Sequence, residues 1–311
     1  MNTLGLSMLV RFGCPCSKET LYVNGQKYYI LEKIGEGFST VSLIENVNSK
    51  KKEDQKSALQ EVEYHKQFQH PNILTCIDYE IVMSSESILN QSSEVYIVLP
   101  YLKRGTLAHE LELRSIARQH MQPLEIMKIF IQICEGVKVF HDAQPEPLAH
   151  RDLKTANILL NDDNTPVIMD LGSMAPATVE VTNSTDAQRL QDIASERCSM
   201  AYRAPELFNV ESIFGVLLYA MCYFKSPFDI VYERGDSVAL AVISGSISFP
   251  EPEIYPKEMH ELILFMLRVN PMERFLSFFS CIHKSCLYYA PWRLATSKRH
   301  MCLSSQRLLG Y

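Results

Sequence analysis

The sequence of 311 residues has little of what marks nucleic-acid-binding, secreted or membrane-spanning proteins. Its formal net charge is −6, whereas nucleic-acid binders are normally basic, so no nucleic acid is expected as a partner. The nine cysteines form no CxxC pair, which favours reduced thiols in a cytoplasmic protein. The longest apolar run, residues 213–224, holds about twelve residues against the ~20 that a membrane-spanning helix needs. We therefore expect this run to be a buried core helix.

Two regions with different sequence patterns follow one another along the chain. Residues 21–100 contain short strand-like runs, including two strands around an Asn24-Gly25 turn, and one helix over 54–68. From residue 105 the pattern is mostly helical, and Pro123–Phe140 places its apolar residues on one face. Residues 1–20 and 275–311 have no usable period and are predicted to be tails. The order of elements predicts an α+β fold with a strand-rich part before a helical part.

Three short motifs carry the chemical information in this sequence. They are His150-Arg151-Asp152-Leu153-Lys154-Thr155-Ala156-Asn157, then Asp170-Leu171-Gly172, then Ala204-Pro205-Glu206. Asp and Asn favour turns, so ordinary turn chemistry is the alternative explanation of each motif alone. In this order and spacing, however, the chain resembles the protein kinases. The resemblance implies a bilobal domain over residues 21–274, with a small lobe over 21–100 and a larger helical lobe over 105–274.

The resemblance also implies a role for each motif residue in transfer of a phosphoryl group from ATP to a Ser or Thr hydroxyl. Asp152 would accept the hydroxyl proton, and Lys154 would contact the γ-phosphate. Asn157 and Asp170 would hold Mg²⁺, which prefers oxygen ligands. The expected nucleotide-binding residues are Ile34, Gly35, Glu36, Gly37, Val41, Leu99, Tyr101, Leu102 and Asp170. The expected structural or regulatory residues are Glu61, His150, Arg151, Ser199, Glu206 and Arg274.

Within the kinases, the chain is similar to the Numb-associated kinase family. The segments that carry this similarity include GEGFS, LKRGTL, MDLGSM and ERCSMAYRAPELF. Relatives carry a CxC sequence near the N-terminus, which Cys14-Pro15-Cys16 matches, so the resemblance implies palmitoylation at Cys14 and Cys16 and peripheral attachment to Golgi or other membranes. Asn2 rather than Gly follows Met1, which excludes myristoylation there. Unmodified cysteines in a loose tail are the alternative.

Four departures from the family pattern leave two functions open. The glycine-rich turn is one residue short, and no V-A-[IL]-K strand lies between Val41 and Glu61, so a stand-in lysine would have to come from Lys50, Lys51, Lys52 or Lys56. The D-x-W segment expected before residue 213 is absent, and the resemblance stops after Arg274. The first hypothesis is an active Ser/Thr kinase acting on protein substrates. The second is a kinase-derived binding module without useful catalysis. A membrane-bound trafficking adaptor, based only on Cys14 and Cys16, is a weaker third.

Overall fold

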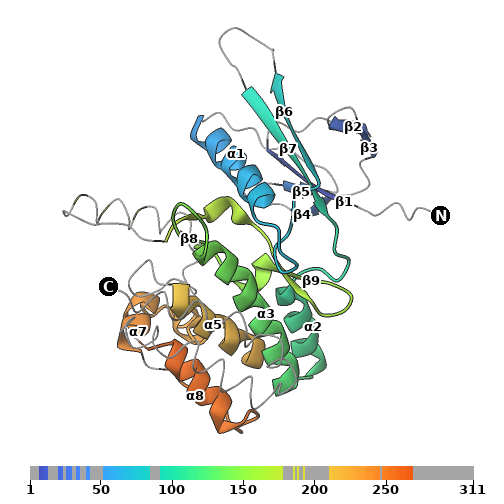
Figure 1. Cartoon of the computed structure of the whole chain (residues 1–311). Helices are drawn as coiled ribbons and strands as arrows, with labels where there is room; N and C mark the ends of the chain where they lie inside the picture. The colour runs from blue at the N-terminus through green and yellow to red at the C-terminus, as the bar shows by residue number, and fades with distance from the viewer. Residues whose placement is uncertain are drawn as a thin grey trace, which may run out of the picture. The chain divides into compact units, whose positions relative to one another are not determined.

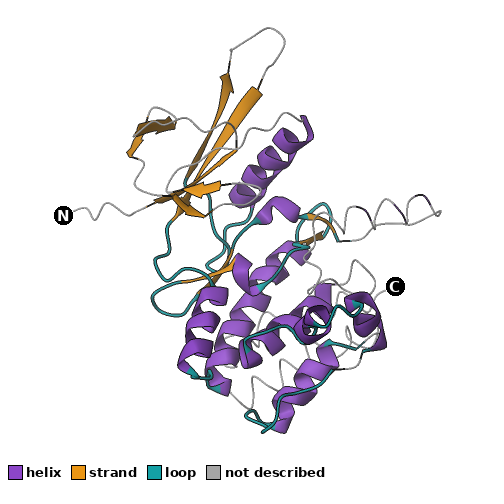
Figure 2. Ribbon diagram, turned by 180° about the vertical axis from the view of Figure 1, so that it is seen from behind, coloured by secondary structure: helices purple, strands orange, loops and turns teal. Residues whose placement is uncertain are grey.

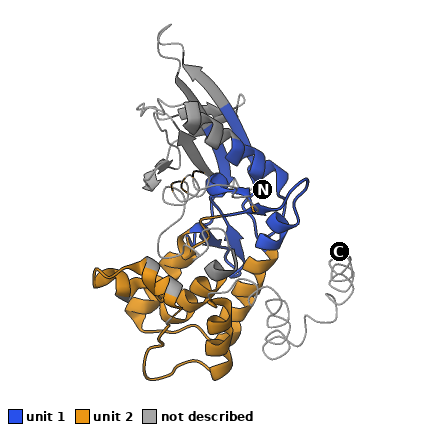
Figure 3. Ribbon diagram, turned by 90° about the vertical axis from the view of Figure 1, so that its left-hand side faces the viewer, with its two compact units in different colours: residues 1–105, 136–150, 157–176 blue, residues 106–135, 151–156, 177–311 orange. Residues whose placement is uncertain are grey.

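A computed structural model describes the backbone of most of the chain. It covers residues 7–12, 20–23, 26–29, 33–35, 40–42, 52–84, 92–177, 185, 188, 192, 210–245 and 247–268. The chain divides into two compact units: residues 1–105, 136–150 and 157–176 form unit 1, and residues 106–135, 151–156 and 177–311 form unit 2 (Figure 3). Each unit is described by itself below.

Unit 1 contains a five-stranded antiparallel sheet in the order β4-β5-β1-β7-β6 (Figure 1). A separate hairpin pairs β2 with β3, joined by the two residues Asn24 and Gly25 as the sequence predicts. The strand bounds are β1 Ser7–Phe12, β2 Thr20–Val23, β3 Gln26–Tyr29, β4 Lys33–Gly35, β5 Thr40–Ser42, β6 Asp78–Ser84 and β7 Ser92–Pro100.

The first strand lies inside the segment predicted to be a tail, and this part of the prediction is wrong. Residues Ser7–Phe12 pair on one side with β5 and on the other with β7. Without a strand in this position, β5 and β7 would each have an unpaired edge. Instead the N-terminus supplies the middle strand, so the backbone groups of β5 and β7 find a ladder partner. Strand pairing over such a sequence distance leaves no local pattern, which is why the sequence did not reveal it.

One helix and two short hairpin-like pairs complete unit 1. Helix α1, Lys52–Gln67, matches the predicted 54–68 and buries Val62 in a cluster with Ile97, Leu99 and Leu74. Burial of these side chains on one face of the sheet stabilises the unit by about 1.5–3 kcal/mol each. The remaining elements are β8 Leu148–Ala149, β9 Ile158–Leu160, β10 Pro166–Ile168, η2 Leu171–Ser173 and β11 Ala175–Pro176. The short helix η1, Thr155–Asn157, begins in unit 2 and ends in unit 1. Figure 2 shows α1 as a purple helix and the strands in orange.

Helices make up the described part of unit 2. Helix α3, Pro123–His141, confirms the predicted amphipathic helix, and its residues up to Glu135 belong to this unit. Thr106 caps the N-terminus of α2, because its side-chain oxygen accepts from the backbone N–H of His109 at 3.2 Å. The helix bounds are α2 Leu107–Ala117, α5 Val210–Tyr223, α6 Asp229–Glu233, α7 Val238–Ser244 and α8 Lys257–Met266.

Helix α5 is the buried core helix that the apolar run predicted. Phe214 and Val216–Tyr223 are all buried, and Phe214 meets Phe130 edge-to-face with ring centroids 6.0 Å apart. The D-x-W segment that the family pattern places before this helix is absent from the sequence. The helix is nonetheless complete, because α8 packs along it: Gly215 lies so close to Leu267 that no side chain fits between them.

Candidate active site

The Asp152 carboxylate lies in unit 2, in the loop that follows His150. Asp152 is buried, with 9 % of its surface exposed, and its Oδ2 lies 2.6 Å from Nζ of Lys154. The two residues are part of one irregular segment that ends in the short helix η1. An ammonium within hydrogen-bond distance holds a buried carboxylate in one orientation. This pair therefore has the charge and position of a proton acceptor held next to a phosphate-binding cation.

The predicted metal ligands Asn157 and Asp170 meet in unit 1. The β9–β10 hairpin joins them, because the backbone N–H of Met169 donates to the carbonyl of Asn157 at 3.0 Å. Nδ2 of Asn157 then lies 3.4 Å from Oδ2 of Asp170. The side-chain oxygens of an amide and a carboxylate are suitable ligands for Mg²⁺, which keeps several waters and takes one or two protein carboxylates. The donor set therefore fits the predicted ion.

Two residues in this region have left-handed backbone conformations. Arg151 has φ of 66° and Asp170 has φ of 62°, and neither is a glycine. Such conformations are disfavoured by about 1–2 kcal/mol. They persist when surrounding contacts impose them, and they cluster at functional sites. One such contact is local to unit 1: Nε2 of buried His150 donates to the carbonyl of Met169 at 3.1 Å, directly before Asp170.

Glu61 of α1 is the predicted ion-pair residue of the site. Its carboxylate faces η2, since a Cβ atom built on Gly172 would lie 3.1 Å from Oε2 of Glu61 and 3.5 Å from Oδ1 of Asp170. Among the residues that the structure describes, His65 is the one basic side chain near this carboxylate, with Nε2 3.8 Å from Oε1. Burial raises the pKa of Glu61, and the charge of Asp170 raises it further, while His65 opposes both effects.

The predicted nucleotide-binding residues lie in unit 1. Leu99 is buried in β7, and the following Tyr101 and Leu102 pack against the same cluster. Gly35 in β4 stands opposite Val41 in β5 across the strand pair, with Ile34 beside it. Outside the described residues lie Glu36, Gly37, Ser199, Glu206, Arg274, Cys14 and Cys16. The predictions for these seven residues stay predictions.

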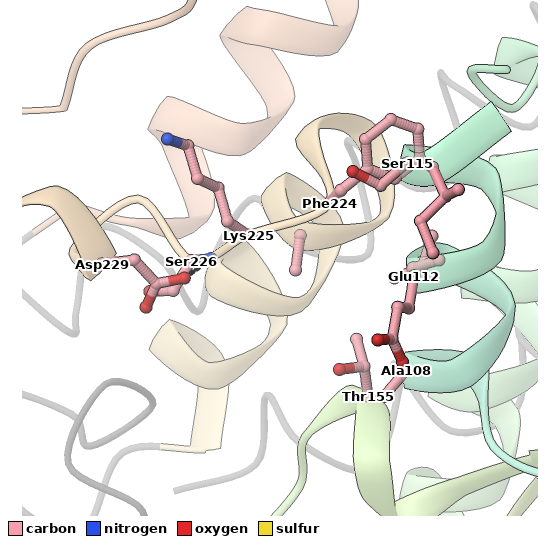
Figure 4. A pocket seen from close by; sticks show the side chains of 11 residues that line it. Ala108, Glu112, Ser115, Thr155, Phe224, Lys225, Ser226 and Asp229 are labelled. Atoms are coloured by element: carbon pink, nitrogen blue, oxygen red, sulfur yellow. Dashed lines mark hydrogen bonds between the residues drawn. The ribbon is translucent and has the colours of Figure 1, made fainter. Parts of the chain in front are cut away.

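Unit 2 also contains a pocket that the sequence did not predict. Its volume is about 290 Å³, and Figure 4 shows its lining by α2, the Asp152 loop and the chain between α5 and α6. Thr155, three residues after Asp152, and Glu112 of α2 lie together at one end. The HRDLKxxN motif names Asp152, Lys154 and Asn157 but leaves Thr155 as a variable position, so the pattern gave no signal for this pocket. The lining residues are Ala108, Leu111, Glu112, Ser115, Ile116, Thr155, Ala220, Phe224, Lys225, Ser226 and Asp229.

Comparison with known proteins agrees with this arrangement. Residues 28–286 match the model of the protein kinase domain, and the chain belongs to the protein kinase family. It is 36 % identical over 284 residues to rat serine/threonine-protein kinase 16, which covers 84 % of this chain and 90 % of the relative. The same figures hold for the human protein of that name. Serine/threonine-protein kinase ppk13 of fission yeast is 26 % identical, over 82 % of this chain and 89 % of the relative.

These matches confirm the predicted fold class and the predicted activity. The fold is the bilobal α+β fold of protein kinases, and the protein is a serine/threonine kinase. The alternative of a catalytically impaired binding module finds no support among the relatives. The narrower resemblance to the Numb-associated family stays a prediction. Over the described residues, no helix is both long and apolar enough to cross a membrane.

Proposed function

We propose that this kinase uses ATP together with Mg²⁺ and phosphorylates Ser or Thr hydroxyls of protein substrates, with Asp152 accepting the hydroxyl proton. The observation that supports this proposal best is the pairing of Asn157 with Asp170, at 3.4 Å. When bound there, Mg²⁺ would neutralise the charge on the phosphate oxygens. Asn157 and Asp170 would hold the ion, and Lys154 would orient the terminal phosphate while its ammonium holds the Asp152 carboxylate in place.

The direct test is transfer of labelled phosphate from ATP to a general protein substrate by the purified full chain. Asp152→Asn keeps the shape of the side chain but cannot accept a proton, so we expect a loss of about 10²-fold or more in kcat with little change in nucleotide affinity. Asp236→Asn is the matched control, because Asp236 is exposed in the turn before α7. Equal transfer by the wild-type and Asp152→Asn proteins would contradict the proposal.

We further propose that the pocket beside Thr155 receives a hydrogen-bond-donating side chain of the protein substrate. Glu112 is exposed and offers a carboxylate, and Thr155 from the Asp152 loop adds a hydroxyl. Thr155 lies three residues after the proposed catalytic base. Glu112→Lys is expected to raise the KM for a protein substrate while the KM for ATP stays the same. An equal KM for the protein substrate in both forms would rule out this role.

Membrane attachment through Cys14 and Cys16 is also a proposal. A single acyl chain gives marginal and reversible binding, so two acylated cysteines are needed for stable attachment. The two cysteines follow directly after strand β1, so an acylated chain would hold the kinase close to the membrane surface. Metabolic labelling with a palmitate analogue, compared between wild type and a variant with both cysteines changed to serine, tests this. Equal labelling of the two forms would exclude it.

A further inference from the structure

We propose that Arg104 is a positioning residue that ties the chain after β7, where the nucleotide base is expected to bind, to the hairpin that carries the proposed magnesium ligands. Its guanidinium nitrogen Nη1 donates to Oδ1 of Asn164 at 2.5 Å and to the carbonyl of Asn161 at 3.4 Å. All three residues belong to unit 1, although 57 and 60 positions separate Arg104 from its two partners in the chain. Hydrogen bonds from a charged donor are stronger than those between neutral groups.

The backbone beside Arg104 forms a second connection between the same two segments. The N–H of Gly105 donates to the carbonyl of Leu102 at 3.0 Å, which closes a tight turn after β7. Gly105 has φ of 73°, a conformation that glycine adopts at no steric cost. Its carbonyl accepts from the N–H of Leu160, the last residue of β9, at 3.0 Å. The side-chain bonds of Arg104 therefore add to a backbone bond one residue away.

The closed end of the β9–β10 hairpin is held in one conformation by its own hydrogen bonds. The N–H of Asn161 donates to the carbonyl of Thr165 at 2.9 Å, and the N–H of Asn164 donates to the carbonyl of Asn161 at 3.0 Å. Asn164 has φ of 68°, a left-handed conformation that asparagine adopts more readily than most residues. These bonds fix the carbonyl of Asn161 relative to the backbone of Asn164. Arg104 therefore binds a preformed pair of acceptors.

The hairpin connects this closed end to the proposed ion ligands. Asn157 directly precedes β9, and Asp170 lies two residues after β10. Tyr101 and Leu102, which are predicted to contact the nucleotide, pack against the cluster that contains Leu159 of β9. A nucleotide with its ion must reach both sets of residues at once, so its affinity depends on a fixed separation between them. This role rests on the proposed function of Asn157 and Asp170 as magnesium ligands.

The first test measures the link itself and needs no nucleotide. Asn164→Gly removes the acceptor Oδ1 but suits the left-handed backbone, and Arg104→Met removes the donor. By hydrogen exchange of the full chain, Arg104→Met should speed exchange of the Leu160 amide by about two- to tenfold, the range that one hydrogen bond represents, and by less in an Asn164→Gly background. Lys103→Met, which removes a charge from the exposed neighbour, is the matched control and should change nothing. An equal effect of Arg104→Met in both backgrounds would overturn the proposal, whether or not the protein binds nucleotide.

The second test compares a ligand that reaches both sets of residues with one that reaches only the first. Arg104→Met should weaken MgADP binding by about two- to tenfold, whereas its affinity for adenosine, which has no phosphate, should stay the same. Asn164→Asp keeps an acceptor oxygen and should bind MgADP as the wild type does. Equal losses for MgADP and adenosine would show that Arg104 only stabilises the turn, and would refute the positioning role. If the wild type bound ADP equally with and without Mg²⁺, the proposed ion ligands would be wrong and the positioning role would fall with them, while the first test would still decide whether the link exists.

Discussion

At the scale of single residues, several unusual backbone and side-chain features lie close to Asp170. Its left-handed backbone, the hydrogen bond from His150 to the preceding carbonyl and the proximity of Glu61 all meet within a few residues. The side chain of Glu61 is largely buried, with 12 % of its surface exposed, and burial raises the pKa of its carboxyl group. A carboxyl group whose pKa is raised on folding favours the folded state below its unfolded pKa of 4.5. That contribution is lost as the pH rises through the folded pKa, because the ionised form is then buried.

Glu61→Gln should therefore increase the free energy of unfolding more at pH 8 than at pH 5. The amide keeps the shape of the side chain and removes the cost of burying a charge at high pH. The measurement is chemical denaturation at both pH values, with Glu63→Gln, an exposed neighbour on the same helix, as the control. A gain of the same size at both pH values would contradict the prediction.

Gly172→Ala tests the space between the two carboxylates. The added methyl group would lie 3.1 Å from Oε2 of Glu61 and 3.5 Å from Oδ1 of Asp170, so it would displace the Glu61 side chain. We expect weaker Mg²⁺-dependent nucleotide binding with a change in thermal stability of less than about 1.5 kcal/mol, because the displaced atoms end a flexible side chain. Titration calorimetry with MgADP measures the first quantity and thermal unfolding the second. Unchanged MgADP affinity would show that displacing Glu61 from Gly172 does not affect the nucleotide site, and would contradict the prediction.

At the scale of secondary-structure elements, glycines mark where a neighbouring segment approaches a helix closely. In unit 2, a Cβ on Gly215 of α5 would lie 2.6 Å from Cγ of Leu267 and 3.2 Å from the backbone of Met266. The neighbour includes backbone, which cannot rotate away. In unit 1, a Cβ on Gly136 of α3 would lie 2.9 Å from Ile168 and 3.1 Å from the carbonyl of Asn72. Both helices therefore pack this closely only because glycine has no side chain at these two positions.

Gly215→Ala should destabilise the protein by about 1–3 kcal/mol, the usual cost of overpacking a core. In an open helix position the same change would instead stabilise by up to about 1 kcal/mol, since Ala is the better helix former. The sign of the change in melting temperature thus separates the two situations. A raised melting temperature for Gly215→Ala would show that α5 and α8 are not packed as described.

At the scale of the whole molecule, the N-terminal strand β1 forms the middle of the five-stranded sheet. Strand β1 lies between β5 and β7 and pairs with β7 over all six of its residues. Because a central strand satisfies backbone groups on both sides, its loss exposes two strand edges at once. The N-terminal strand is thus part of the sheet of unit 1.

Deletion of residues 2–12 should abolish the thermal shift that MgADP produces, whereas deletion of residues 2–5 should preserve it. The longer deletion removes β1, and the shorter one leaves the strand complete. Hydrogen exchange gives a second measurement: backbone amides of β7 should lose protection only in the longer deletion. Retained protection of β7 in that variant would show that β1 is dispensable.

Much of the secondary structure of this protein was predictable from local sequence patterns. The Asn24-Gly25 hairpin follows from turn chemistry, α1 and α3 follow from helical sequence patterns, and the buried α5 follows from a continuous apolar run. Each of these signals depends on neighbours in the chain. The spacing of Asp152, Lys154, Asn157 and Asp170 is likewise a local signature, and the relatives confirm the activity that it predicts. Structure that depends on residues close together in the chain could therefore be predicted from the sequence alone.

Only the tertiary structure decided which strand fills the centre of the sheet and what stands beside Glu61. The pairing of residues 7–12 with 95–100 joins segments more than eighty positions apart, and the gain from such a ladder appears only after the chain has closed the loop between them. In the same way, His65 is an ordinary helix residue in the sequence. In the folded chain the carbonyl of Leu74 lies against its Nδ1, and its Nε2 lies 3.8 Å from Oε1 of Glu61.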